Sequence, residues 1–310
     1  MKILVTGGAG FIGSQVTRAY LEAGHQVVVV DDLSRGKRER VPTDIPLYTV
    51  DICDQEAVQE ILACERPDVV NHHAALVSVR ESHQVPERYH RVNWQGTQCM
   101  VDALPASVWK FVFASSGGAI YGEAPHLPVT EETPTKPISP YGESKLLAEN
   151  LLMQRDHLET VILRYGNVYG PDQDLLNNNG VITIFTRALL DGAQPAIFGD
   201  GTQVRDYVFI DDAAQANLCA LKPGLRGIFN IATGTGHTLL EVYQKIAAQL
   251  QVDRPLLFRS RNSYEVLQNI LDIQRAQNGL GWQPQVPFDD GLRLTVHSIA
   301  ARVADTATLK

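Results

Sequence analysis

Short unbroken runs of apolar residues recur along the first half of the chain. Alternation of apolar and polar residues would instead indicate half-exposed strands. Residues 2–6 form one run, and residues 26–31 form another that contains four consecutive valines. Strands that are apolar at every position are typical of a parallel sheet covered by helices on both faces. Residues 12–24 have helical character and end at a glycine, a common helix stop. The chain therefore begins with a predicted β-α-β unit.

The same alternation of strand and helix continues to about residue 166. It predicts an α/β fold, a Rossmann-type doubly wound parallel sheet. Further strands are expected over residues 46–50, 69–71, 109–114 and 160–163. Helices are expected over residues 82–103 and 141–154, and we expect these two helices to pair in a homodimer.

After Gly166 the pattern loosens, which predicts a second and smaller lobe. We expect residues 1–166 to form the sheet domain, with later segments returning to it. Residues 167–310 then form mainly a C-terminal α/β lobe that binds substrate. Its expected elements are a polar loop over 177–180, a helix over 181–192, strands over 195–198 and 205–209, and helices that begin at Asp211–Asp212 and at the capping box of Thr238 and Glu241.

Composition places the chain among ordinary globular proteins. Apolar residues make up 44% of the 310 residues, charged residues 20%, and mean hydropathy is −0.11. No apolar run approaches the roughly 18 residues of a membrane span, and no signal-peptide core follows the first strand. We therefore predict a cytoplasmic protein without a membrane partner. A net charge of −8 disfavours nucleic acid as a partner.

The four cysteines carry no pattern of a disulfide framework or a zinc site. Cys53, Cys64, Cys99 and Cys219 are scattered and form no C-x-x-C pair. We interpret them as small buried hydrophobic residues, and we predict no metal site.

A glycine cluster follows the first predicted strand. Gly7, Gly10 and Gly13 fit the pattern G-x-x-G-x-x-G, and a second frame starts at Gly8. Missing side chains let the turn bend and let backbone N–H groups approach a pyrophosphate at the start of the next helix. Asp31 ends the second strand and can accept hydrogen bonds from the ribose hydroxyls of a dinucleotide. The pattern predicts a dinucleotide site.

The choice of dinucleotide depends on the charges near Asp31. Its carboxylate would repel a 2′-phosphate, which favours NAD over NADP. Arg35, Lys37 and Arg38 lie just downstream and could bind such a phosphate. We interpret these three residues as a solvated loop.

A tyrosine and a lysine lie four residues apart on one predicted helix. Tyr141 and Lys145 follow Pro140, which suits a helix start, and the spacing places both on one face. A nearby ammonium lowers the pKa of a phenol, so Tyr141 could act as a base. Ser115 and Ser116 end a strand and could orient a substrate hydroxyl toward it, and we favour Ser116.

Together these motifs resemble the extended short-chain dehydrogenase/reductase family and, within it, the NAD-dependent epimerases and dehydratases. The resemblance covers nearly the whole chain and is strongest to the UDP-glucose 4-epimerase group. It is carried by TGGAGFIGS from Thr6, DDLS from Asp31, HHAA from His72, YGESK from Tyr141, LRYGNVYGP from Leu163 and LGWQP from Leu280.

The resemblance implies the ligand contacts of the chain. For NAD these are Gly7, Gly10, Phe11, Ile12, Gly13, Asp31, Asp32, Leu33, Ser34, Asp51, Ile52, His73, Ala74, Ala75, Asn93, Tyr141, Lys145 and Tyr165. For a nucleotide sugar they are Ser116, Tyr141, Asn167, Val181, Phe198, Arg205 and Arg261, with Arg259 as a rival to Arg261.

The resemblance also implies a reaction. Ser116, Tyr141 and Lys145 would catalyse redox-neutral inversion at C4 of a UDP-hexose through a 4-keto sugar. Dehydratases of the family carry an acidic pair where Gly117 and Gly118 stand here, so dehydration is disfavoured. The alternatives are 4-epimerisation of UDP-glucuronate or a UDP-N-acetylhexosamine, a nucleotide-sugar reductase, and a regulator without chemistry.

Overall fold

The predicted doubly wound sheet is confirmed by a computed structural model, which describes residues 1–174, 180–262 and 264–308. A parallel seven-stranded sheet has the order β10-β6-β5-β4-β1-β2-β3. Its strands are β1 (Lys2–Thr6), β2 (Gln26–Val30), β3 (Leu47–Tyr48), β4 (Val69–His72), β5 (Lys110–Ser116), β6 (Glu159–Tyr165) and β10 (Gly227–Ile231). The strand order reverses beside β1, which is where ligands of such sheets bind.

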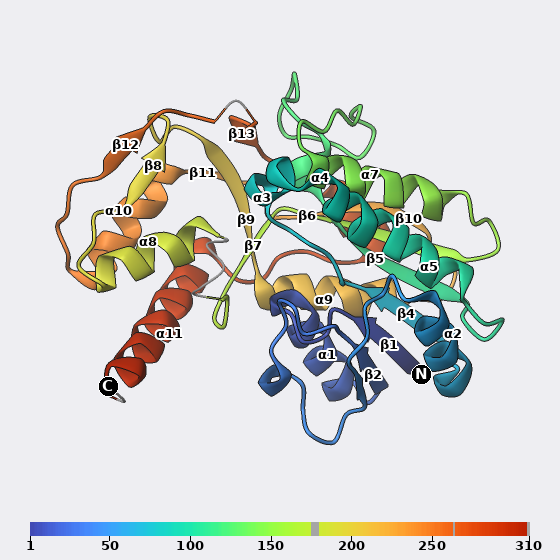
Figure 1. The fold of residues 1–310 in the computed structure, drawn as a ribbon. Helices are drawn as coiled ribbons and strands as arrows, with labels where there is room; N and C mark the ends of the chain where they lie inside the picture. Colours follow the sequence, from blue (N-terminus) through green and yellow to red (C-terminus); the bar gives the residue numbers. More distant parts are fainter. Residues whose placement is uncertain (175–179, 263, 309–310) are drawn as a thin grey trace.

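Helices cover both faces of this sheet (Figure 1). On one face lie α1 (Phe11–Glu22) and α9 (Ile210–Ala220), and on the other lie α2 (Gln55–Glu65), α5 (Gly96–Asp102) and α7 (Pro140–Met153). Within β1, Ile3 and Val5 pack toward the first face and Leu4 toward the second. All three are fully buried, which explains why the strand is apolar at every position.

The second lobe lies beside the sheet domain in Figure 1 and has its own core. A four-stranded sheet contains β7 (Asn167–Tyr169), β9 (Val204–Phe209), β11 (Gly236–Thr238) and β13 (Gln268–Asn269), and a two-stranded sheet contains β8 (Ala196–Phe198) and β12 (Leu257–Arg259). Around them pack α8 (Val181–Leu190), α10 (Leu239–Leu250) and α11 (Phe288–Thr308). The chain returns to the main sheet through α9, β10 and the π-helix at Ala276–Leu280.

The single helix expected over residues 82–103 is wrong. The segment forms α3 (Val79–Gln84), α4 (Pro86–Tyr89), a π-helix at His90–Gln95 and α5. The break falls at Val85, whose φ of −136° and ψ of 58° are not helical. Pro86 causes it, because proline disfavours the helical conformation in the preceding residue.

Other local predictions have mixed outcomes. The helix start at Thr238 is confirmed, since the Thr238 hydroxyl accepts a hydrogen bond from the Glu241 N–H at 3.1 Å, while the Glu241 carboxylate meets His237 Nδ1 at 2.8 Å. The strand over 46–50 shrinks to two residues, and a 3₁₀-helix at Arg38–Arg40 was not expected. The loop over 177–180 lies outside the described residues except for Gly180.

The cysteines are free thiols, but Cys64 is exposed and the other three are partly exposed, so their predicted burial is wrong. Within the described residues, no helix is long and apolar enough to cross a membrane.

Candidate active site

A cavity of about 670 Å³ opens at the carboxyl ends of the central strands, between the sheet domain and the second lobe. The residues that follow β1, β4 and β5 line it, together with the end of β6 and residues of β7, α8 and β9. A smaller cavity of about 110 Å³ adjoins it and shares Gly7, Gly10 and His73 with it. This is the switch point at which a doubly wound sheet binds ligands.

The glycine cluster forms a cradle without room for side chains. Gly7 has a φ of +67°, and a Cβ there would lie 2.6 Å from the Ala74 nitrogen. A Cβ on Gly13 would lie 2.2 Å from the Gly7 carbonyl oxygen. Gly10 caps the N-terminus of α1, whose free N–H groups form an anion site beside the cavity. These residues fit the diphosphate of a dinucleotide.

Asp31 is placed for a ribose in the smaller cavity. The residue is only 6% exposed, and its carboxylate accepts hydrogen bonds from the Ala9 and Leu33 N–H groups, both at 2.9 Å. Burial raises the pKa of Asp31, and these two hydrogen bonds oppose the rise. The remaining residues of this cavity include four predicted cofactor contacts, namely Asp32, Ser34, Asp51 and Ile52.

The basic residues after Asp31 have acidic or backbone partners. Arg35 forms a salt bridge with Glu81 at 2.8 Å, and Lys37 lies 3.5 Å from Asp174. Arg38 donates to the Val41 carbonyl oxygen at 3.1 Å. A 2′-phosphate would compete with these partners, so the geometry favours NAD.

The HHAA segment places one histidine at the cavities. His73 and Ala75 line both of them, and Ala74 lines the smaller one. Burial lowers the pKa of His73 to about 3, so its ring is neutral. Its Nε2 atom is buried and has no hydrogen-bond partner among the described residues.

Asn93 and Tyr165 take different positions. Tyr165 lines the larger cavity. Asn93 lines neither cavity, because its amide binds the backbone of Leu76, accepting from the N–H at 2.8 Å and donating to the carbonyl oxygen at 2.9 Å. Asn93 therefore supports Leu76, which lines both cavities, and does not itself face them.

The three predicted catalytic residues converge on the larger cavity. Tyr141 and Lys145 lie on the first turns of α7, whose N-terminus is capped by the Ser139 hydroxyl. Lys145 is 3% exposed and donates to the Ala114 carbonyl oxygen at 2.8 Å. Ser116 ends β5 and hydrogen-bonds the Tyr141 hydroxyl.

The structure separates the two serines. The Ser115 hydroxyl is buried and donates to Glu149 at 2.6 Å. Ser116 instead meets Tyr141. The geometry favours Ser116 as the residue that meets a substrate hydroxyl.

Burial shifts the pKa of both Tyr141 and Lys145. Burial raises the pKa of Tyr141, and the hydrogen bond from Ser116 opposes this rise. Burial lowers the pKa of Lys145 to about 7. The negative charge of Glu149 opposes this shift, because it raises the pKa. The loss of hydration dominates the pKa of both groups in this structure.

The predicted substrate residues divide into two groups. Asn167, Val181, Phe198 and Arg205 line the larger cavity. Arg259 and Arg261 are exposed and line neither cavity, so the structure supports neither as a ligand contact there. Both lie on or just beyond β12, a strand of the outer two-stranded sheet.

Sequence reasoning missed several residues around the substrate side. Leu76 and Tyr264 line the larger cavity. Arg80 stacks on the Phe198 ring at 4.7 Å, and His83 stacks on Tyr264 at 4.3 Å. These contacts join α3 to the second lobe. No pattern of spacing marks them, since they depend on segments more than a hundred residues apart.

Comparisons with known proteins agree with this geometry. Residues 3–232 match the model of the NAD dependent epimerase/dehydratase family. A crystal structure of UDP-glucose 4-epimerase with UDP-glucose from Thermotoga maritima is 40% identical, with a TM-score of 0.95, and the match covers 98% of this chain and 100% of that one. UDP-glucose 4-epimerase from Thermus thermophilus, in complex with NAD, is 40% identical, with a TM-score of 0.90 and coverage of 96% and 99%.

A third solved structure has another substrate in its name. It is UDP-N-acetylglucosamine 4-epimerase from Methanobrevibacter ruminantium, in complex with UDP-N-acetylmuramic acid. It is 31% identical, with a TM-score of 0.90, and the match covers 97% of this chain and 98% of that one.

The chain belongs to the NAD-dependent epimerase/dehydratase family, as its motifs indicated. Its cofactor is NAD. It is an isomerase, an epimerase similar to UDP-glucose 4-epimerases.

Proposed function

We propose that the protein interconverts UDP-glucose and UDP-galactose by inverting C4 of the hexose through a transient 4-keto sugar. The observation that carries the proposal is the convergence of Ser116, Tyr141 and Lys145 on the cavity that adjoins the glycine cradle. Gly117 and Gly118 follow the serine, so the acidic pair of the related dehydratases is missing.

Each residue of the site has its own role in the proposed reaction. Ser116 orients the sugar 4-hydroxyl toward Tyr141, and the Tyr141 phenolate accepts its proton. Lys145 supplies a positive charge beside the phenolate. Asn167 and Arg205 hold the nucleotide, since guanidinium offers paired donors to phosphate oxygens. NAD, bound by the glycine cradle and Asp31, supplies the acceptor and donor of the hydride.

The substrate test is incubation of the purified protein with UDP-galactose and a trace of NAD. We expect UDP-glucose to form without accumulation of absorbance at the NADH band. If the protein did not convert UDP-galactose but turned over another UDP-sugar, that sugar would replace UDP-galactose as the proposed substrate. Steady accumulation or consumption of NADH would indicate a net oxidoreductase instead.

A UDP-N-acetylhexosamine is the second candidate substrate, because a solved relative is named for UDP-N-acetylglucosamine. The chemistry at C4 is the same, and only the room around C2 of the sugar differs. Turnover of UDP-N-acetylglucosamine at a kcat/KM equal to or above that for UDP-glucose would favour this candidate.

Asp31→Ala should weaken NAD binding by about tenfold to a hundredfold. The carboxylate is the acceptor for a ribose hydroxyl, and charge-assisted hydrogen bonds contribute roughly 1.5–3 kcal/mol each. Loss of the charge that repels a 2′-phosphate should also reduce the ratio of NAD affinity to NADP affinity. Calorimetric titration of both dinucleotides checks this. Equal NAD affinity in the variant and the native protein would contradict the placement of the ribose.

A further inference from the structure

The end of β5 contacts the inner face of α7 through three successive residues. The Ala114 carbonyl oxygen accepts from Lys145, the Ser115 hydroxyl donates to Glu149, and Ser116 hydrogen-bonds Tyr141. Tyr141, Lys145 and Glu149 are spaced by four residues and so share one face of the helix. Two of these three have roles in the proposed reaction, and the third is a buried carboxylate without one.

Glu149 is held in a fixed position inside the protein. It is 1% exposed and receives hydrogen bonds from Arg164 Nη2 at 2.6 Å and Arg164 Nε at 3.0 Å. The Ser115 hydroxyl donates to the same carboxylate at 2.6 Å. A buried charge is tolerated when it is paired and its lone pairs are satisfied in this way. The Glu149 carboxylate is therefore fully engaged by Arg164 and Ser115.

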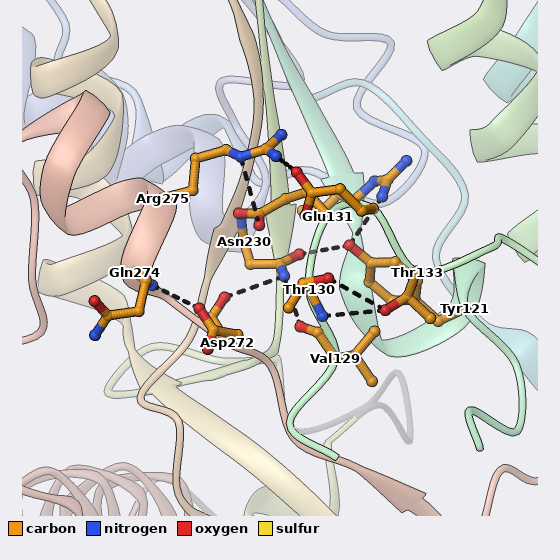
Figure 2. A network of polar contacts seen from close by, with 11 residues as sticks. Tyr121, Val129, Thr130, Glu131, Thr133, Asn230, Asp272, Gln274 and Arg275 are labelled. Atoms are coloured by element: carbon orange, nitrogen blue, oxygen red, sulfur yellow. Dashed lines mark hydrogen bonds and ion pairs between the residues drawn. The ribbon is translucent and has the colours of Figure 1, made fainter. Parts of the chain in front are cut away.

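Arg164 is itself fixed from the side away from Glu149. Its Nη1 donates to the Tyr121 hydroxyl at 2.8 Å, and that hydroxyl donates to Asn230 Oδ1 at 2.8 Å. Asn230 Nδ2 in turn donates to the carbonyl oxygens of Val129 and Asp272, at 3.0 and 3.1 Å (Figure 2). The ion pair is thus part of a network that reaches the second lobe.

The surroundings of Lys145 contain few charges. Tyr141 and Glu149 flank it on α7, and β5 contributes the Phe113 ring, 4.8 Å from Nζ. His72 and His73 come from β4 and the residue after it, and burial lowers the pKa of each to about 3, so both are neutral. In the described part of the chain, Glu149 is the carboxylate whose charge acts on the Lys145 ammonium. Arg164, its partner, lies on β6.

We propose that Glu149, fixed by Arg164 and Ser115, is a positioning residue that keeps Lys145 in its ammonium form in the working enzyme. Lys145 is only 3% exposed, and burial alone favours the neutral amine. A negative charge one helical turn away offsets this cost. The inference rests on the proposed function, in which the Lys145 ammonium stabilises the Tyr141 phenolate.

The test follows the titration of Lys145 directly. Full-length protein saturated with NAD is labelled with ¹³C-lysine, and the εCH₂ signal that disappears in Lys145→Met is followed against pH. Glu149→Gln should lower the midpoint of this titration by at least about one pH unit, a tenfold change in the protonation equilibrium. Glu149→Asp, which keeps the charge, should restore most of the shift. A folded Glu149→Gln protein with the native midpoint would overturn the proposal.

Two further variants keep the result interpretable. Glu143→Gln removes a half-exposed carboxylate from the same helix and should leave the midpoint unchanged. Glu149→Gln leaves Arg164 buried without its partner, so the double variant Glu149→Gln/Arg164→Gln removes both charges if the single variant does not fold. Equal midpoints in the folded double variant and in Arg164→Gln alone would refute the role, because these two proteins differ only in the charge of residue 149. Since the titration needs no turnover, it distinguishes failure of this inference from failure of the proposed 4-epimerase activity.

Discussion

Tyr141→Phe is expected to lower turnover of UDP-galactose by roughly 10³-fold, within the range of a lost general acid–base group. The substitution removes one oxygen atom that Ser116 hydrogen-bonds and leaves the ring packed against Leu76, Tyr89 and Ala119. NAD content and UDP affinity should stay within about twofold of the native values. Coupled assay of UDP-glucose formation, with calorimetry for the ligands, measures both effects.

The control for this substitution removes a phenolic hydroxyl elsewhere. Tyr48 lies on β3 and hydrogen-bonds Glu65 on α2, away from both cavities. Tyr48→Phe should therefore keep native turnover. If Tyr141→Phe turned over UDP-galactose at a near-native rate, Tyr141 would not be the base. The proton acceptor of the proposed mechanism would then be another group.

The sheet domain was predictable because its signals are local. Buried parallel strands are apolar at every position, and the glycine cradle and the Tyr141–Lys145 spacing each lie within a few residues. Strand β10 was not predicted as a strand, although a return of later segments was expected. Gly227–Ile231 follows a helix of the sheet domain, and only its pairing with β6 places it in the sheet.

The substrate side was less predictable because it is assembled from distant segments. Arg261 was chosen from a resemblance, yet it lies on the exposed side of the second lobe. Arg80 on α3 stacks on Phe198 of the second lobe, a contact that no local pattern records. Ser115 and Ser116 could not be separated from sequence, since the partner that distinguishes them, Glu149, lies on another element.

Asp206→Asn is expected to lower the free energy of unfolding by about 3 kcal/mol. The native carboxylate is fully buried and connects three segments. Its Oδ1 accepts from the N–H and the hydroxyl of Thr233, at 2.8 and 2.7 Å. Its Oδ2 accepts from the N–H groups of Gly234 and Leu271, at 2.9 and 3.2 Å. Asp206 lies next to Arg205, so loosening these segments should also raise KM for the nucleotide sugar.

The size of this effect follows from the hydrogen bonds of the amide. Asparagine has one acceptor oxygen in place of two. Its NH₂ group therefore faces two of the donors that the carboxylate oxygen had accepted from, and each donor left without an acceptor costs roughly 1–3 kcal/mol. Burial raises the pKa of Asp206, which shows that its charge is costly, and the neutral amide recovers part of that cost. The net effect therefore falls in the lower part of the range. Urea unfolding followed by circular dichroism measures it, with Asp289→Asn on the exposed side of α11 as the control. Equal unfolding midpoints for Asp206→Asn and the native protein would show that Asp206 does not hold the three segments together.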